Sequence, residues 1–156
     1  MQTFTRRTLL GSAAALMAAP AVGFAAAAQM VVNKDPNCGC CTGWVKHIQA
    51  ASFDVRVVEM ADLAPLKSRL AIPRTLLSCH TAQIDGYVIE GHVPAPVIKR
   101  LLTERPAAIG LAVPGMPVGS PGMEVPAAPD DTYNVVLFGA SGQRVYARYK
   151  GPRELT

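Results

Sequence analysis

The sequence has no apolar stretch that is both long and uninterrupted, which argues against a transmembrane anchor. Its apolar run extends from Leu9 to about Phe24, contains Pro20, and is followed by the small residues Ala25–Ala28. Such a run is shorter than a membrane-spanning helix, and small residues after it suit cleavage by a signal peptidase. We therefore predict a signal peptide at residues 1–28.

Paired arginines precede this apolar run. Arg6 and Arg7 are followed closely by Leu9 and Leu10, a pattern that resembles a twin-arginine signal. The alternative is an ordinary secretory signal in which the two arginines are accidental. Both interpretations predict an exported protein, and we expect it in the periplasm, where disulfides can persist.

Charge of one sign is not in large excess either. Arg6 and Arg7 are two of the 15 basic residues, so 13 basic residues face 11 acidic ones once the signal is removed. A surface that is close to neutral gives no electrostatic case for nucleic-acid binding. No internal repeat is evident, and residues 29–156 have the length of one ordinary domain.

Cysteine is scarce, but three of the four cysteines are clustered. Cys38, Cys40 and Cys41 fall within four positions, and Cys79 lies far downstream beside a histidine. Neighbouring thiols such as those of Cys40 and Cys41 are poorly placed to bridge each other, and a set meant for stapling would be spaced apart. The pattern therefore indicates thiol redox chemistry or binding of a soft metal.

The hydrophobic pattern predicts a mixed α/β domain whose cysteine cluster lies at the start of the first helix. The order is strand, helix, strand, helix, strand, strand, helix, followed by a long loop and a closing β-hairpin. The expected elements are strands at 30–34, 54–60, 75–84, 87–93, 133–138 and 144–149, helices at 42–51, 62–70 and 95–104, and a Pro/Gly/Met-rich loop at 106–129. This order, with Cys38-x-x-Cys41 before the first helix, predicts a thioredoxin-like fold.

The start of a helix is a chemically suitable place for these thiols. The free N–H groups and partial positive charge there stabilise thiolate, which is both the nucleophile and the metal ligand. Thioredoxin folds also place a cis-proline facing the cysteine loop, and Pro73 stands at that point of the sequence. A trans-proline that simply ends a helix is the alternative.

The expected hairpin places a histidine opposite the fourth cysteine. Asp85-Gly86 between two apolar runs predicts a two-residue turn, and in that register Cys79 faces His92 on one side of the sheet while His80 points to the other. Cys79 and His92 would then form half of a metal site. The alternative is a buried cysteine that packs beside a histidine bonded to a loop.

The long loop adds soft ligand candidates. Met116 and Met123 both follow a Pro-Gly pair, and thioether sulfur selects Cu(I). Methionine also fills gaps in cores, which is an equal alternative for Met123. Loops of this length are usually either functional or disordered.

Four motifs make the sequence similar to a known family. They are Cys38-Gly39-Cys40-Cys41-x-x-Trp44, Ser78-Cys79-His80-Thr81-Ala82, Asp85-Gly86-Tyr87-Val88-x-Glu90-Gly91-His92-Val93-Pro94 and the stretch Gly110–Glu124. Over nearly all of residues 29–156 the chain resembles the DUF411 family, which includes the CopG-type periplasmic copper-resistance proteins. The resemblance implies a thioredoxin-like fold that holds copper as a cluster. It implies thiolate ligands at Cys38, Cys40, Cys41 and Cys79, which we extend to His92 and Met116.

We therefore expect a periplasmic copper-binding protein that holds more than one copper ion, as Cu(I) or Cu(II), and contributes to copper resistance or redox handling. Its expected partners are copper ions and periplasmic copper-export or copper-carrier proteins. Whether it is an enzyme, such as a copper oxidoreductase, stays open. The alternatives are a thiol–disulfide oxidoreductase that uses Cys38 and Cys41, a zinc site built from those two residues with Cys79 and His92, and an iron–sulfur cluster.

Overall fold

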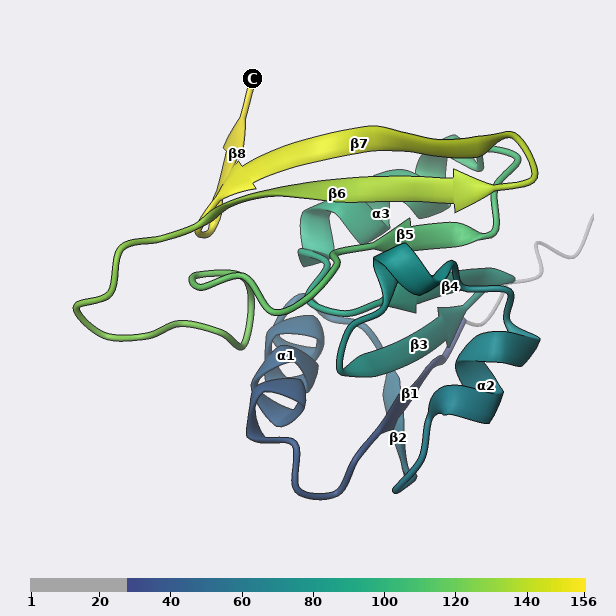
Figure 1. The fold of residues 1–156 in the computed structure, drawn as a ribbon, viewed down its shortest axis with the longest axis horizontal. Helices are drawn as coiled ribbons and strands as arrows, with labels where there is room; N and C mark the ends of the chain where they lie inside the picture. The colour runs from purple at the N-terminus through teal and green to yellow at the C-terminus, as the bar shows by residue number, and fades with distance from the viewer. Residues whose placement is uncertain (1–27) are drawn as a thin grey trace, which may run out of the picture.

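The computed structural model describes residues 28–156, and the signal peptide predicted at residues 1–28 lies outside this range except for its last residue. The described residues form a mixed α/β fold around one eight-stranded sheet (Figure 1). The helices are α1 (Gly39–Ala50), α2 (Ala64–Arg69) and α3 (Ala95–Glu104), with a 3-10 turn η1 (Arg74–Leu76). The strands are β1 (Met30–Lys34), β2 (Val55–Glu59), β3 (His80–Ile84), β4 (Tyr87–Glu90), β5 (Gly110–Ala112), β6 (Thr132–Gly139), β7 (Gly142–Lys150) and β8 (Arg153–Leu155).

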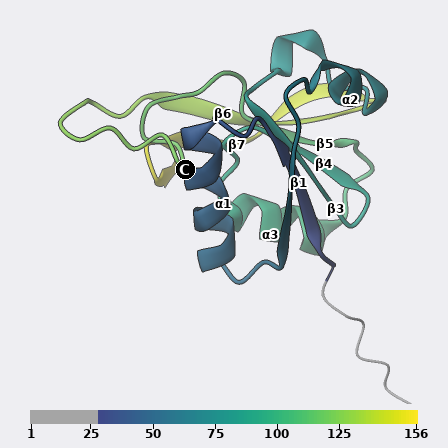
Figure 2. The ribbon, with the colours of Figure 1, turned by 90° about the horizontal axis from the view of Figure 1, so that it is seen from below.

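The strands follow the spatial order β2-β1-β3-β4-β5-β6-β7-β8. β1 pairs in parallel with β2, and β4 pairs in parallel with β5, whereas the other neighbours are antiparallel. Helices α1 and α3 lie on one face of the sheet and α2 lies on the opposite face (Figure 2). The element order predicted from the sequence is thus confirmed through α3.

The larger core lies between the sheet and the pair α1 and α3. Trp44 of α1 is fully buried there, and its Nε1 donates a hydrogen bond to the carbonyl oxygen of Val93 at 2.9 Å. Helix α3 contributes one apolar face, made of Ala95, Val97, Ile98 and Leu101. Each large side chain buried in this way stabilises the fold by about 1.5–3 kcal/mol. The core therefore fixes α1, and with it the cysteine cluster, against the sheet.

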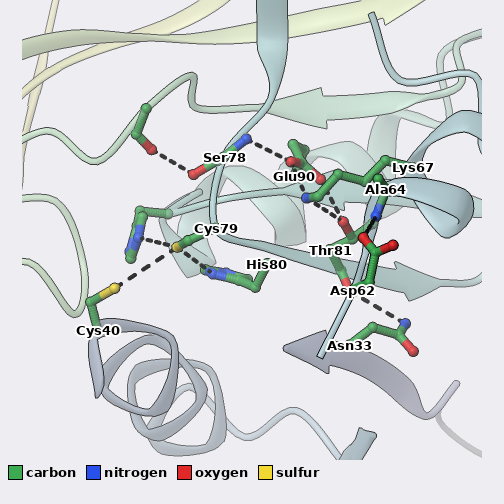
Figure 3. A network of polar contacts seen from close by, with 12 residues as sticks. Asn33, Cys40, Asp62, Ala64, Lys67, Ser78, Cys79, His80, Thr81 and Glu90 are labelled. Atoms are coloured by element: carbon green, nitrogen blue, oxygen red, sulfur yellow. Dashed lines mark hydrogen bonds and ion pairs between the residues drawn. The ribbon is translucent and has the colours of Figure 1, made fainter. Parts of the chain in front are cut away.

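The opposite face carries a buried polar network instead of a purely apolar contact. Glu90 of β4 is fully buried, and its Oε1 accepts a hydrogen bond from Lys67 Nζ of α2 at 2.5 Å. The same ammonium donates to Thr81 Oγ1 at 2.9 Å, and that hydroxyl donates to Glu90 Oε2 at 2.7 Å (Figure 3). A charged pair of this kind is tolerated in an interior because its hydrogen bonds are satisfied. The network attaches α2 to the middle of the sheet.

Several predicted elements differ in extent from the structure. The strand expected at 75–84 begins at His80, because η1 occupies its first part. The strand expected at 87–93 ends at Glu90, since Gly91 has a φ of +70° that breaks the extended backbone. The region expected as a loop at 106–129 contains β5, a strand of three residues that the surrounding prolines and glycines concealed.

Residues 113–131, which follow β5, contain neither helix nor strand and pack partly against α1. Gly122 has a φ of +84°, and a Cβ at this position would collide with the backbone of Cys40 and Trp44. Only glycine allows this close approach. The loop is thereby held beside the cysteine cluster.

The alternatives for Pro73 can be compared with residues 28–156. The Ile72–Pro73 peptide bond is trans, because this range contains no cis peptide bond. No helix in the same range is long and apolar enough to cross a membrane.

Candidate metal centre

The start of α1 positions three of the four cysteines. Cys38 is the N-cap of the helix, and its Sγ accepts a hydrogen bond from the backbone N–H of Cys41 at 3.3 Å. Cys38 and Cys41 are joined by a disulfide, with their Cα atoms 5.4 Å apart. One turn of helix brings residues i and i+3 together on one face, which explains why this pair meets and the adjacent pair does not.

The remaining two cysteines carry free thiols and complete a compact group of sulfur atoms. Cys40 Sγ lies 3.5 Å from Cys38 Sγ and 3.8 Å from Cys79 Sγ. All four sulfur atoms lie within 4.8 Å of one another. Two thiolates on one tetrahedral ion at about 2.3 Å are about 3.8 Å apart, so this spacing suits a shared metal. The four cysteines could act together as ligands once the disulfide is reduced.

Two imidazoles flank the sulfur of Cys79. His92 Nε2 lies 3.1 Å from Cys79 Sγ, and His80 Nδ1 lies 3.3 Å from the same atom (Figure 3 shows Cys40, Cys79 and His80). His92 Nδ1 donates to the carbonyl oxygen of Pro121 at 2.9 Å. This bond leaves the Nε2 lone pair of a neutral imidazole directed at the sulfur, the arrangement that orients metal-binding histidines.

The predicted hairpin register is confirmed, but the predicted direction of His80 is wrong. Ile84 pairs with Tyr87 and Thr81 with Glu90, where the ladder ends, just before Cys79 and His92. Alternation of side chains would keep His80 away from Cys79, yet its Nδ1 touches that sulfur. The reason is that β3 begins only at His80. Cys79 lies outside the regular strand, so its side chain does not follow the alternation.

Burial favours the uncharged forms of both imidazoles and of the Cys79 thiol in the metal-free site. It lowers the pKa of His92 and lowers that of His80 well below the usual range, which keeps both imidazoles uncharged near neutral pH. It also raises the pKa of the Cys79 thiol to about 12, with a further contribution from Cys40 beside it. Uncharged imidazole is the form that binds metal, whereas Cys79 must lose its proton on binding.

The backbone before Cys79 is fixed by the buried network. The N–H of Ser78 donates to Glu90 Oε1 at 2.7 Å, and Ser78 Oγ donates to the carbonyl oxygen of Gly115 at 2.5 Å. Ser78 also fills the space where a side chain at Gly91 would stand. The roles of Ser78 and Glu90 were not predicted from the sequence, although an acidic residue inside an apolar strand was a visible signal.

Cys79 is accessible from the α2 side of the sheet. It lines a cavity of about 620 Å³ together with residues of α2 and of the segment that precedes β3. The cavity wall is mainly apolar, with Lys67 and Arg74 as its charged members. A small ligand in this cavity would therefore lie beside Cys79.

Met116, the ligand predicted in the loop, lies at the surface, and the preceding Gly115 accepts a hydrogen bond from Ser78 beside Cys79. The Met116 side chain is 53% exposed and lines a different, open pocket with Pro114, Asp131 and Tyr133. The structure thus brings together Cys38, Cys40, Cys41, Cys79 and His92 and adds His80.

Comparisons with known proteins give a family and two similar structures. The model of the family described as "Protein of unknown function, DUF411" matches residues 76–123. The solved structure "Copper resistance protein copG- Form 2" is 48% identical with a TM-score of 0.74, covering 80% of this chain and 99% of that chain. "Copper resistance protein copG- Form 1" is 49% identical with a TM-score of 0.73, covering 79% and 98%. A comparison with curated proteins found no match.

Proposed function

The chain belongs to the DUF411 family, and we propose that it is an exported copper-binding protein that contributes to copper resistance. The observation that carries this proposal is the gathering of four cysteine sulfurs within 4.8 Å of one another. Thiolate is a soft ligand that favours Cu(I), and a bridging thiolate can bind two ions at once. We expect the reduced protein to hold a thiolate-bridged cluster of more than one copper ion.

The proposed ligands are Cys38, Cys40, Cys41 and Cys79, with His92 as a nitrogen ligand and Met116 as a sulfur ligand of the loop. The position of His92 Nε2, 3.1 Å from Cys79 Sγ, supports its assignment. Imidazole binds both Cu(I) and Cu(II), so a mixed ligand set would permit redox cycling of copper. The assignment of Met116 as a ligand rests only on the preference of thioether sulfur for Cu(I).

We also propose that the fold is thioredoxin-like. The order β2-β1-β3-β4, with β1 and β2 parallel, supports this, as does the Cys-x-x-Cys sequence at the start of α1. The trans peptide bond before Pro73 departs from the expected cis-proline. Export to the periplasm, by the twin-arginine or the general secretory route, follows from the signal predicted at residues 1–28. Periplasmic copper-export or copper-carrier proteins are the proposed partners.

A thiol–disulfide oxidoreductase is the second candidate, and the Cys38–Cys41 disulfide favours it. Such an enzyme uses only the outer two cysteines, one as nucleophile and one to resolve the mixed disulfide. It has no need of Cys40 or of the imidazoles beside Cys79. Cys40 is therefore the residue that separates the two functions.

The test is a pair of assays on two cysteine variants. In the copper protein, Cys40→Ser lowers the amount or the affinity of bound Cu(I), because it removes a thiolate that lies between Cys38 and Cys79. In the oxidoreductase, the same variant keeps its insulin reduction, whereas Cys38→Ser abolishes it. Unchanged copper binding by Cys40→Ser, together with rapid insulin reduction by the wild type, would reject the copper proposal. A melting curve of the metal-free variant reveals any loss of fold.

A further inference from the structure

His80 is placed in the interior at a position where packing alone does not require histidine. Its side chain is fully buried, and its ring centroid lies 4.4 Å from that of Trp44. Within residues 28–156, its Nε2 is the buried side-chain nitrogen or oxygen that has no hydrogen-bond partner. An unpaired buried polar atom is unfavourable, and phenylalanine would fill the same space without one. The reason for a histidine here must therefore lie in its other nitrogen, Nδ1.

That second nitrogen faces a sulfur that already has one imidazole beside it. His80 Nδ1 lies 3.3 Å and His92 Nε2 3.1 Å from Cys79 Sγ, and the three atoms lie within 4.8 Å of one another. On one tetrahedral zinc ion, a nitrogen at about 2.0 Å and a sulfur at about 2.3 Å are about 3.5 Å apart. The observed separations differ from this value by a few tenths of an ångström, so small side-chain shifts would admit an ion.

The disulfide determines which donors are free. With Cys38 and Cys41 bonded to each other, the four-thiolate set is reduced to the thiols of Cys40 and Cys79, whereas the imidazoles of His80 and His92 remain available beside Cys79. Two imidazoles and one thiolate are a borderline donor set, which suits Zn(II) or Cu(II) better than Cu(I). Three protein ligands also leave one position of a tetrahedral ion open.

We propose that Cys79, His80 and His92 form a three-ligand site for a borderline divalent cation, available in the disulfide-bonded protein and joined to the thiolate cluster through Cys79 Sγ. This inference rests on the proposed copper function, because the three-ligand site and the four-thiolate cluster share Cys79 Sγ. The disulfide-bonded form of the centre would therefore prefer a divalent ion, whereas the fully reduced form, with four thiolates, would prefer Cu(I).

Zinc is the appropriate probe, because it is redox-inert and cannot oxidise the free thiols. The mature chain is prepared without reductant, its two free thiols are counted, and Zn(II) is titrated against a chromophoric chelator. We expect one zinc per chain and at least about tenfold weaker binding in His80→Phe, since even a ligand's supporting contacts are worth ten- to a hundredfold. His47→Gln, which keeps an acceptor for the N–H of Ala95, is the control and should bind zinc like the wild type.

Nitrogen-15 NMR of the wild-type imidazoles provides a second measurement that does not depend on a variant folding. Zinc should shift His80 Nδ1 and His92 Nε2 and leave His47 unchanged. The proposal is overturned if His80→Phe binds zinc like the wild type, if His80 Nδ1 stays a protonated donor to Cys79 after zinc is added, or if the disulfide-bonded protein binds no zinc. If only the three-ligand site is wrong, the reduced protein still binds Cu(I). If the proposed copper function is wrong, the reduced protein does not bind Cu(I).

Discussion

Cys40 Sγ and Cys79 Sγ lie 3.8 Å apart although 39 positions separate them in the chain. Cys40 is held by the first turn of α1, and Cys79 by the segment that enters β3. Their contact depends on Trp44 anchoring α1 and on Glu90 anchoring Ser78. The candidate metal centre is thus assembled by the tertiary fold, and its properties should respond to changes in the fold as well as in the ligands.

Reduction of the Cys38–Cys41 disulfide should raise the copper capacity. The disulfide-bonded protein offers two free thiols, and the reduced protein offers four. We expect Cu(I) bound per chain to increase after treatment with a non-thiol reductant that is then removed. Thiol counting before each titration fixes the starting state.

The double variant Cys38→Ser/Cys41→Ser provides the control for this experiment. Its capacity should equal that of the disulfide-bonded wild type and should not change with reductant. Equal copper capacity in the oxidised and reduced wild type would show that these two sulfurs are not ligands.

Glu90 should affect copper binding through the position of Cys79. Glu90→Ala removes the carboxylate that accepts hydrogen bonds from the Ser78 N–H and from Lys67 Nζ in the buried network. We expect weaker Cu(I) affinity and a loss of stability of about 1–3 kcal/mol or more from the unpaired donors. Chelator competition measures the first effect, and denaturant unfolding of the metal-free protein measures the second.

Lys67→Met is the matched variant for Glu90→Ala. It leaves the Glu90 carboxylate buried without its cation and should cost about 3–5 kcal/mol. The bond from Ser78 to Glu90 survives, however, so copper affinity should fall less than in Glu90→Ala. A positioning role for Glu90 is refuted if affinity in the two variants simply follows their stability.

Gly122 should be intolerant of a side chain. Its φ of +84° and the nearby backbone of Cys40 and Trp44 leave no room for a Cβ. We expect Gly122→Ala to destabilise the protein by more than about 1 kcal/mol, because alanine pays for an unfavourable φ and for a steric clash. We also expect it to disturb the cysteine cluster. The measurements are thermal unfolding and Cu(I) affinity.

Gly39→Ala offers a control from the same neighbourhood, because a Cβ at Gly39 meets no atom within 4 Å. Alanine is also the better helix former, so this variant should be at least as stable as the wild type. If Gly39→Ala and Gly122→Ala lose similar stability, steric crowding at Gly122 is not the cause of the destabilisation.

The sequence was informative where local chemistry decides the structure. Asp85-Gly86 predicted the hairpin register, and the spacing of apolar residues predicted the order of elements through α3. The grouping of Cys79 with His92 followed from that register alone.

The remaining features depend on tertiary contacts that no local pattern encodes. β5 has only three residues and is stabilised by its neighbours β4 and β6. The Ser78 backbone leaves the expected strand because a side chain from β4 binds its N–H. For the same reason Cys79 is free to turn toward His80, which strict alternation of side chains had placed on the other face.

The most direct test of the copper proposal is a titration of the reduced mature protein with Cu(I) against a competing chelator, with zinc offered in a parallel competition. Four thiolates within 4.8 Å of one another, together with neighbouring imidazoles, predict more than one Cu(I) per chain and a clear preference for Cu(I) over zinc. Saturation at a single ion, or a preference for zinc under equal conditions, would contradict the thiolate-bridged copper cluster.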